Sequence, residues 1–139
     1  MDGIKRYNVI YTARAMRCLD EKVDYISWKF GDSNLAEKWY FRLREEIQES
    51  LSTFPYKYQI YDVPPWNKYK VRLFLSRKDV VAYLVDEDAA CVRVIGVCTK
   101  GKEMTSFLNE SMAEEKQTGS RSQAAGGNAP SEASDQGRP

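Results

Sequence analysis

The sequence predicts an α+β domain that begins with one short strand, continues with two antiparallel helices and ends with three strands in an antiparallel meander. Between residues 13 and 54, hydrophobic side chains recur every three or four positions, which is the helical period, and Gly31-Asp32 interrupts this pattern. After Pro55 the pattern changes to the alternation of a strand. A chain of 139 residues, 42% hydrophobic and 29% charged, is expected to form one small domain.

The first strand is predicted from its aromatic and β-branched residues. The two helices are predicted from the spacing of their apolar residues and from their capping residues. Tyr7 to Tyr11 is typical of a strand, and Thr12 can cap the helix that follows. The first helix has its apolar face at Met16, Leu19, Val23, Ile26 and Phe30. Gly31 can end this helix, and Asp32, Ser33 or Asn34 can begin the next one. The second helix has its apolar face at Ala36, Tyr40, Leu43, Ile47, Leu51 and Phe54, and Pro55 ends it.

Three strands are predicted after Pro55. In the first, Val71, Leu73 and Leu75 alternate with Arg72, Phe74 and Ser76, so we expect Arg72 to point away from the core. The second, Val80 to Val85, is almost continuously apolar, as in a central strand. Asp86 to Asp88 provides a turn before the third, Cys91 to Val97. An unbroken last strand would place Cys91 and Cys98 on opposite faces.

The folded domain is predicted to occupy residues 1–108, and residues 109–139 to form a helix end and a disordered low-complexity tail. Met104, Phe107, Leu108 and Met112 have the spacing of one short closing helix. From Ala113 onward the chain has no Leu, Ile, Val, Phe, Tyr or Trp. Such a segment cannot bury enough apolar surface to offset the entropy lost on ordering.

Positive charge is concentrated between Tyr56 and Lys78, which hold six basic residues and one acid, a net of 6 − 1 = +5. Aromatic residues are interleaved with this charge, which suits an exposed nucleic acid or an acidic protein groove. The candidate binding residues are Arg72, Arg77, Lys78, Arg93, Trp66 and Tyr69. An alternative interpretation has equal weight. In it, the aromatic side chains cover the edge of the sheet and the lysines only keep the loop soluble. Arg93 can equally form a surface pair with Glu87 or Asp88.

The composition argues against several other classes of function. The chain has no histidine, and its three cysteines lack paired spacing, so neither a metal site nor a disulfide framework is expected. No phosphate-loop, dinucleotide or calcium motif is present, so no small-molecule cofactor is expected. No apolar run is long enough to cross a bilayer and no signal segment is seen, so we expect no membrane partner and a cytoplasmic location.

Several short motifs, in their order and separation, resemble the RelE/ParE superfamily of toxins from type II toxin–antitoxin systems over roughly residues 5 to 102. In the first part of the chain they are Tyr7-Asn8-Val9-Ile10-Tyr11-Thr12-Ala13-Arg14-Ala15, Leu19 through Tyr25-Ile26, Gly31-Asp32, Ala36 with Trp39, and Ser50-Leu51-Ser52-Thr53-Phe54-Pro55. In the second part they are Arg72, Tyr83-Leu84-Val85-Asp86, and Val92 to Val97.

The resemblance implies a helical hairpin packed on one face of a mostly antiparallel sheet of about four strands. It also implies a growth inhibitor held inactive by a cognate antitoxin. RelE-like members cut messenger RNA on the ribosome, and here Arg72, Lys70 and Lys68 would be the catalytic candidates. The nucleolytic set is incomplete, because Cys98-Thr99-Lys100 stands where many relatives carry His or Arg, and no tyrosine follows Tyr83.

ParE-like members instead inhibit DNA gyrase by protein contact, and the resemblance favours this branch. The long hairpin, its Gly-Asp turn and the Ser-Leu-x-x-Phe-Pro ending are similar to it. Arg72 would then be a structural or interface residue, and Tyr83 a packed sheet residue. A third hypothesis is a partner-binding module on the same fold that has lost toxicity.

Overall fold

The computed structural model describes residues 5–111, which form an α+β fold. In chain order the elements are β1 (Asn8–Tyr11), α1 (Ala13–Phe30), α2 (Ser33–Thr53), α3 (Trp66–Tyr69), β2 (Arg72–Ser76), β3 (Asp79–Asp86) and β4 (Cys91–Thr99). Residues 104–111 are also helical, as the spacing of Met104, Phe107 and Leu108 predicts. Met112 and the predicted tail from Ala113 lie outside the described residues. Within residues 5–111, no helix has the length and apolar character needed to span a membrane.

The capping residues explain why α1 and α2 begin and end where they do. Thr12 Oγ1 accepts a hydrogen bond from the backbone N–H of Ala15 at 3.1 Å. Gly31 ends α1 with a φ of 61°, in the left-handed region that glycine adopts without steric cost. Asp32 then caps α2 by accepting hydrogen bonds from the N–H groups of Asn34 and Leu35. The predicted helical hairpin is therefore specified locally.

The four strands form one sheet in the order β1-β4-β3-β2. β1 pairs with β4 in parallel, and the other two pairings are antiparallel. The register of β3 against β4 shifts at Ala82/Tyr83, because Ala82 lies opposite Gly96 while Tyr83 lies opposite Val94. The extra residue is Ile95, so this bulge reverses the alternation along β4.

The bulge corrects the expectation for the cysteines of this strand. Cys98 packs in the cluster on the sheet face away from the helical hairpin, and Cys91 lines a pocket with Tyr69 on that same side. Both thiols therefore lie on one face at opposite ends of β4. Neither forms a disulfide, and Cys18 is free as well.

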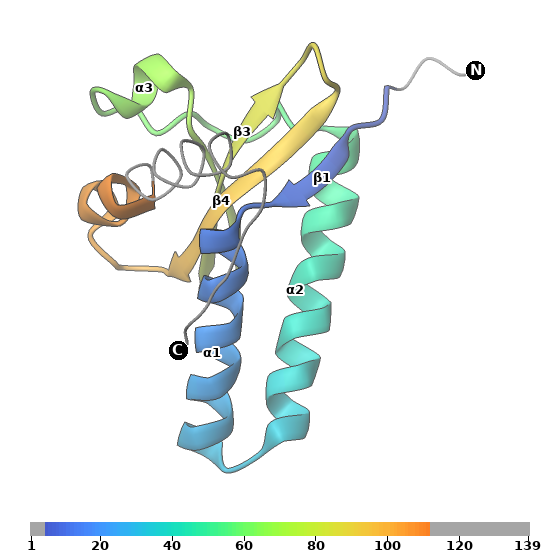
Figure 1. Cartoon of the computed structure of the whole chain (residues 1–139), viewed down its shortest axis with the longest axis vertical. Helices are drawn as coiled ribbons and strands as arrows, with labels where there is room; N and C mark the ends of the chain where they lie inside the picture. Colours follow the sequence, from blue (N-terminus) through green and yellow to red (C-terminus); the bar gives the residue numbers. More distant parts are fainter. Residues whose placement is uncertain (1–4, 112–139) are drawn as a thin grey trace, which may run out of the picture.

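Both faces of the sheet are covered (Figure 1). The α1–α2 hairpin packs on one face, around Leu19, Leu43, Tyr83 and other side chains of a first buried cluster. Figure 1 shows this hairpin projecting beyond the sheet, with the α1–α2 turn at its far end. The predicted α+β arrangement, with the hairpin on one face, is confirmed.

The opposite face is covered by α3 and the helical segment 104–111, which form a second cluster with Trp66, Phe107 and Leu108. Gly96 permits this close packing, because a Cβ atom there would lie 2.5 Å from Cζ of Phe107. The sequence did not predict α3. Since the helix spans only Trp66–Tyr69, it has no apolar period to detect.

The expected orientation of β2 is wrong. Phe74 is 6% exposed and packs against the hairpin, whereas Leu75 is 52% exposed. Arg72 shares its face with Phe74, so it lies on the hairpin side of the sheet and not away from the core. Alternation alone could not select the face, because α3 and Trp66 also cover the side on which Val71 packs.

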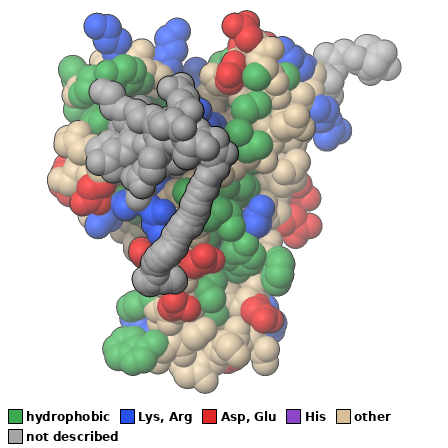
Figure 2. Space-filling view, viewed as in Figure 1, with side chains coloured by type: hydrophobic (Ala, Val, Ile, Leu, Met, Phe, Trp, Pro, Cys, Tyr) green, Lys and Arg blue, Asp and Glu red, His purple; other side chains and the backbone are tan. Residues whose placement is uncertain are grey.

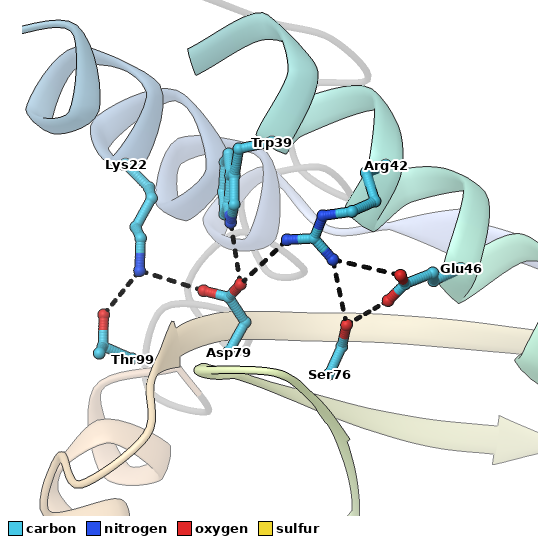
Figure 3. Close-up of polar contacts among 7 residues, drawn as sticks. All are labelled: Lys22, Trp39, Arg42, Glu46, Ser76, Asp79 and Thr99. Carbon is cyan, nitrogen blue, oxygen red and sulfur yellow. Dashed lines mark hydrogen bonds and ion pairs between the residues drawn. The ribbon is translucent and has the colours of Figure 1, made fainter. Parts of the chain in front are cut away.

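A buried carboxylate joins the hairpin to the sheet (Figure 3). Asp79, at the start of β3, is 2% exposed. Its Oδ1 is 3.1 Å from Nζ of Lys22 on α1, and its Oδ2 accepts a 2.8 Å hydrogen bond from Nε1 of Trp39 on α2. Lys22 also donates to the Thr99 hydroxyl at 2.9 Å, and Nη2 of Arg42 lies 3.9 Å from Oδ2 of Asp79. One carboxylate thus has donors from both helices.

Arg42 extends this network to β2. Its Nη1 lies 3.2 Å from Oε2 of Glu46 and 3.4 Å from the Ser76 hydroxyl, which in turn donates to Glu46. The hydroxyl of Ser76, and then Arg42, lower the pKa of the Glu46 carboxyl. The middle of α2 is therefore held against the end of β2 by charge-assisted hydrogen bonds.

Replacing Asp79 by Asn should destabilise the fold by about 3 kcal/mol, because it leaves Lys22 and Arg42 without their shared buried anion. Urea unfolding monitored by circular dichroism measures this difference. The matched control is Asp88→Asn in the exposed β3–β4 turn, which should stay within about 0.5 kcal/mol of the wild type. Equal effects of the two substitutions would contradict this role of Asp79.

Candidate functional site

The residues predicted to form one basic surface lie in three separate places. Arg72 is on the hairpin face of β2, near the loop that follows α2. Tyr69 and Arg93 lie on the opposite face, beside α3. Arg77 and Lys78 form the β2–β3 turn, about 16 Å from the start of β2 by the rise of a five-residue strand. The surplus of charge in the sequence is therefore distributed over the fold.

Arg72 holds the loop between α2 and α3 against the sheet. Its Nη1 donates to the backbone carbonyl of Tyr58 at 2.6 Å and to that of Tyr56 at 3.2 Å. The guanidinium carbon lies 5.1 Å from the centre of the Tyr56 ring. The segment is also tied to β2 by the Leu73 N–H, which donates to the carbonyl of Gln59 at 3.1 Å. Arg72 is thus half-buried and engaged with backbone oxygens.

Glu87 contacts the same tyrosine as Arg72, and it accepts hydrogen bonds from three side chains that are distant in the sequence. It accepts hydrogen bonds from Lys5 Nζ, from the Tyr7 hydroxyl at 2.8 Å and from the Tyr56 hydroxyl at 2.7 Å. The Lys5 ammonium, followed by the Tyr56 and Tyr7 hydroxyls, lowers the pKa of Glu87 to about 2. The hydrogen bond to Glu87 raises the pKa of Tyr56 to about 12. Both shifts move the pKa values of these two groups further from pH 7.

Tyr83 has a packing role at the same end of the sheet. Its side chain is fully buried, and its hydroxyl donates to the backbone carbonyl of Pro55 at 2.6 Å. Burial raises the pKa of this phenol well above its usual value. Tyr83 lies directly opposite Arg72 in the β2–β3 ladder, so both residues hold the chain that leaves α2. This agrees with the expectation that Tyr83 is a packed sheet residue.

The other face carries a shallow pocket of about 490 Å³ beside α3. Tyr69, 54% exposed, and Arg93 contribute to its wall together with Leu84 and Ile10. Asp86, Glu87, Asp88, Val85 and Cys91 complete the lining. Carboxylates of the β3–β4 turn thus line the same pocket as Arg93.

The remaining candidates divide between the surface and the core. Lys68 and Lys70 are exposed, and Lys70 ends α3 with a φ of 62°. Trp66 is 3% exposed and packs in the second cluster, so its ring is not a surface platform. The predicted binding role of Trp66 therefore has no exposed ring to support it, whereas Tyr69 keeps a free edge.

Sequence reasoning missed the part played by Glu87, Tyr7 and Lys5. The sequence predicted Glu87 as a turn residue and as a possible partner of Arg93, and it predicted Tyr7 as the start of a strand. Their proximity depends on β1 lying beside β4 in parallel, which brings residues 5–7 to the turn at 86–88. No spacing in the sequence encodes this contact.

Two solved structures of toxin–antitoxin systems contain chains with a similar fold. A chain of the toxin–antitoxin complex RelBE2 from Mycobacterium tuberculosis superposes with a TM-score of 0.55 at 16% identity, over 73% of this chain and 100% of that chain. A chain of the chromosomal ParDE toxin–antitoxin system from P. aeruginosa gives a TM-score of 0.55 at 17% identity, over 68% of this chain and 97% of that chain. No protein-family model and no curated protein matches the sequence. The expected RelE/ParE-like fold is confirmed.

Stability should fall in acid because of Glu87. Its pKa in the folded protein is about 2, below the ordinary value of 4.5, so its stabilising contribution is present above pH 4.5 and is lost as the pH falls toward 2. Melting temperatures measured from pH 6 to pH 2 should therefore decline less steeply for Glu87→Gln than for the wild type. Glu110→Gln is the control, since Glu110 is an exposed residue paired only at the surface with Arg14. Parallel pH curves for the wild type and Glu87→Gln would contradict the assignment.

Proposed function

We propose that the chain is the toxin of a toxin–antitoxin pair and inhibits growth by binding DNA gyrase. The fold it shares with chains of the RelBE2 and ParDE systems supports the toxin class. The long hairpin, its Gly31-Asp32 turn and the ending of α2 resemble the ParE-like branch. A cognate antitoxin is the expected partner, and the cytoplasm is the expected location.

The observation that carries the proposal for contact rather than catalysis is the position of Arg72. In the nucleolytic interpretation its guanidinium binds the scissile phosphate. Here the same Nη1 atom donates to two backbone carbonyls, which already use part of its hydrogen-bonding capacity. Glu87 and Tyr56 are not suited to act as an acid and a base near neutral pH, because the pKa of Glu87 is about 2 and that of Tyr56 about 12.

A ribosome-dependent endoribonuclease is the second candidate. It is favoured by the exposure of Lys68, Tyr69 and Lys70 on one short segment beside the pocket that Arg93 lines. Cations with an exposed aromatic ring can bind a single-stranded nucleic acid. A non-toxic partner-binding module on the same fold is the third candidate, and growth under strong induction separates it from both.

Purified full-length protein should block supercoiling of relaxed plasmid by DNA gyrase at stoichiometric concentrations. The expected mechanism is protein contact, so inhibition of gyrase should not require cleavage of a nucleic acid. Primer extension on messages from induced cells, performed in parallel, should show no codon-positioned cuts. Cuts without gyrase inhibition would establish the second candidate, and normal growth without either effect would establish the third.

The Arg72→Met substitution distinguishes a structural role from a catalytic one. It should lower the free energy of unfolding by about 1.5 kcal/mol, because two charge-assisted hydrogen bonds to the loop are lost. Growth inhibition at a temperature where the variant stays folded should persist. Arg77→Met, in the exposed turn at the other end of β2, is the matched control and should change stability by no more than about 0.5 kcal/mol. Loss of toxicity with unchanged stability would instead support catalysis by Arg72.

A further inference from the structure

A groove of about 590 Å³ between α1 and the end of β4 has both charged and aromatic walls. The loop after β4 and the start of the helical segment 104–111 complete its lining. The charged residues that line it are the cations Arg14, Lys22, Lys100 and Lys102 and the carboxylates Glu21 and Asp79. Figure 2 shows basic and acidic side chains together beside the end of β4, with hydrophobic side chains below them, toward the hairpin end. A groove of this volume can hold a small molecule.

The carboxylate of Asp79 on the buried side of the groove is already neutralised by the fold (Figure 3). Its side chain is 3% exposed, and its oxygens are shared by Lys22, Trp39 and Arg42. Lys22 also donates to the Thr99 hydroxyl at 2.9 Å. An ammonium group has three N–H donors, so Lys22 keeps one donor for a ligand after these two contacts. The buried side of the groove therefore presents a donor and not a free anion.

Two further cations at this end of the groove are not used by the fold. Lys100 and Lys102 are exposed on either side of Gly101 and form no ion pair with a carboxylate of residues 5–111. Lys100 directly follows Thr99, whose hydroxyl binds Lys22, so the three lysines line one end of the groove. Lysine binds phosphate as a compact point charge. This end is therefore suited to phosphate groups.

The other end of the groove offers an aromatic surface. Tyr25 lies three residues after Lys22 on α1 and is 48% exposed. Its ring centre is 6.5 Å from that of Trp28, which is 79% exposed, and the two ring planes meet at 41°. From Lys22 to Trp28 the helix rises about 9 Å. A nucleobase stacks well on exposed rings of this kind, and the distance suits the length of an extended nucleotide.

Glu21 stands beside both ends of the groove. It is exposed, precedes Lys22 in the sequence and lies four residues before Tyr25, so its carboxylate and the tyrosine ring share a helix face. A carboxylate repels phosphate, but it accepts hydrogen bonds from the 2′- and 3′-hydroxyls of a ribose. The ribose joins the phosphates to the base, and its place between the lysines and Tyr25 is next to Glu21.

We propose that this groove binds a nucleoside diphosphate or triphosphate. The phosphates contact Lys22, Lys100 and Lys102, the ribose hydroxyls donate to Glu21, and the base stacks on Tyr25. The sequence predicts no small-molecule cofactor because it has no phosphate-loop motif, and this site uses lysine side chains in place of the backbone N–H groups of such a loop. The inference goes beyond the proposed function and does not depend on the target of the protein.

The test is isothermal titration calorimetry of the full-length protein with ADP as the probe, in buffer without divalent cations. Saturable binding of one ADP per chain is expected. Adenosine and pyrophosphate each supply only part of the proposed contacts, so each should bind at least about tenfold more weakly than ADP.

The double substitution Lys100→Gln and Lys102→Gln tests the phosphate end. It should weaken the binding of both ADP and pyrophosphate about tenfold or more. The control Lys38→Gln with Lys57→Gln makes the same change of charge at exposed sites outside the groove, and should leave both affinities within about twofold. All four lysines are exposed, so the melting temperatures should be unchanged.

Two single substitutions test the rest of the nucleotide. Tyr25→Ala should weaken ADP about fivefold or more and leave pyrophosphate unchanged, because only the base contacts the ring. Phe41→Ala is its control, since this ring is 65% exposed on α2 and lies outside the groove. Glu21→Gln should reduce the preference for ADP over its 2′,3′-dideoxy analogue, which has no ribose hydroxyl to donate.

Three results would overturn the proposal. The first is the absence of saturable ADP binding, or equal weakening by the groove variants and their controls. The second is equal affinity for ADP and pyrophosphate with no effect of Tyr25→Ala, which would make the groove a general anion site. The third is single-stranded RNA that binds more tightly than ADP and loses affinity in the same variants, which would make it a nucleic-acid surface. Gyrase inhibition and growth are measured separately, so their failure does not affect these outcomes.

Discussion

The buried carboxylate of Asp79 is the contact on which the arrangement of the two layers depends. Apolar packing alone allows a helical hairpin to slide over a sheet, because burial of hydrocarbon has little directional preference. Asp79 removes this freedom, since its two oxygens are shared by Lys22 of α1 and by Trp39 and Arg42 of α2. The cost of burying a charge is offset only when these donors are in place. The network therefore fixes the position of both helices relative to β3.

The positive charges of the chain divide between internal and external roles. Arg72 and Lys22 are used within the fold, the first to hold a loop through carbonyl oxygens and the second to satisfy Asp79. Lys100 and Lys102 remain exposed at the surface just after β4. A surplus of charge in a sequence segment therefore does not identify a binding surface by itself. The partners of each cation decide whether it is available.

The two ends of the sheet offer different chemistry. At the end near the β3–β4 turn, Glu87, Tyr56 and Arg72 satisfy one another or the backbone, and the pKa shifts stabilise fixed protonation states. At the other end, α1 and the end of β4 bring the neutral thiols of Cys18 and Cys98 near two exposed lysines, Lys100 and Lys102. The first arrangement resists changes of charge, whereas the second leaves two cations exposed at the surface.

The sequence by itself determined the elements other than α3, because helix caps, apolar periods and turn residues are local: Thr12, Gly31, Asp32 and Pro55 mark boundaries that the structure keeps. It also determined the RelE/ParE-like arrangement through the order of these elements. The tertiary structure decided which face of β2 is covered, which cysteines share a side and what Arg72 contacts. These features depend on α3, on the bulge at Ile95 and on parallel pairing of β1 with β4. Each joins residues far apart in the chain, and alternation cannot choose between two faces that are both buried.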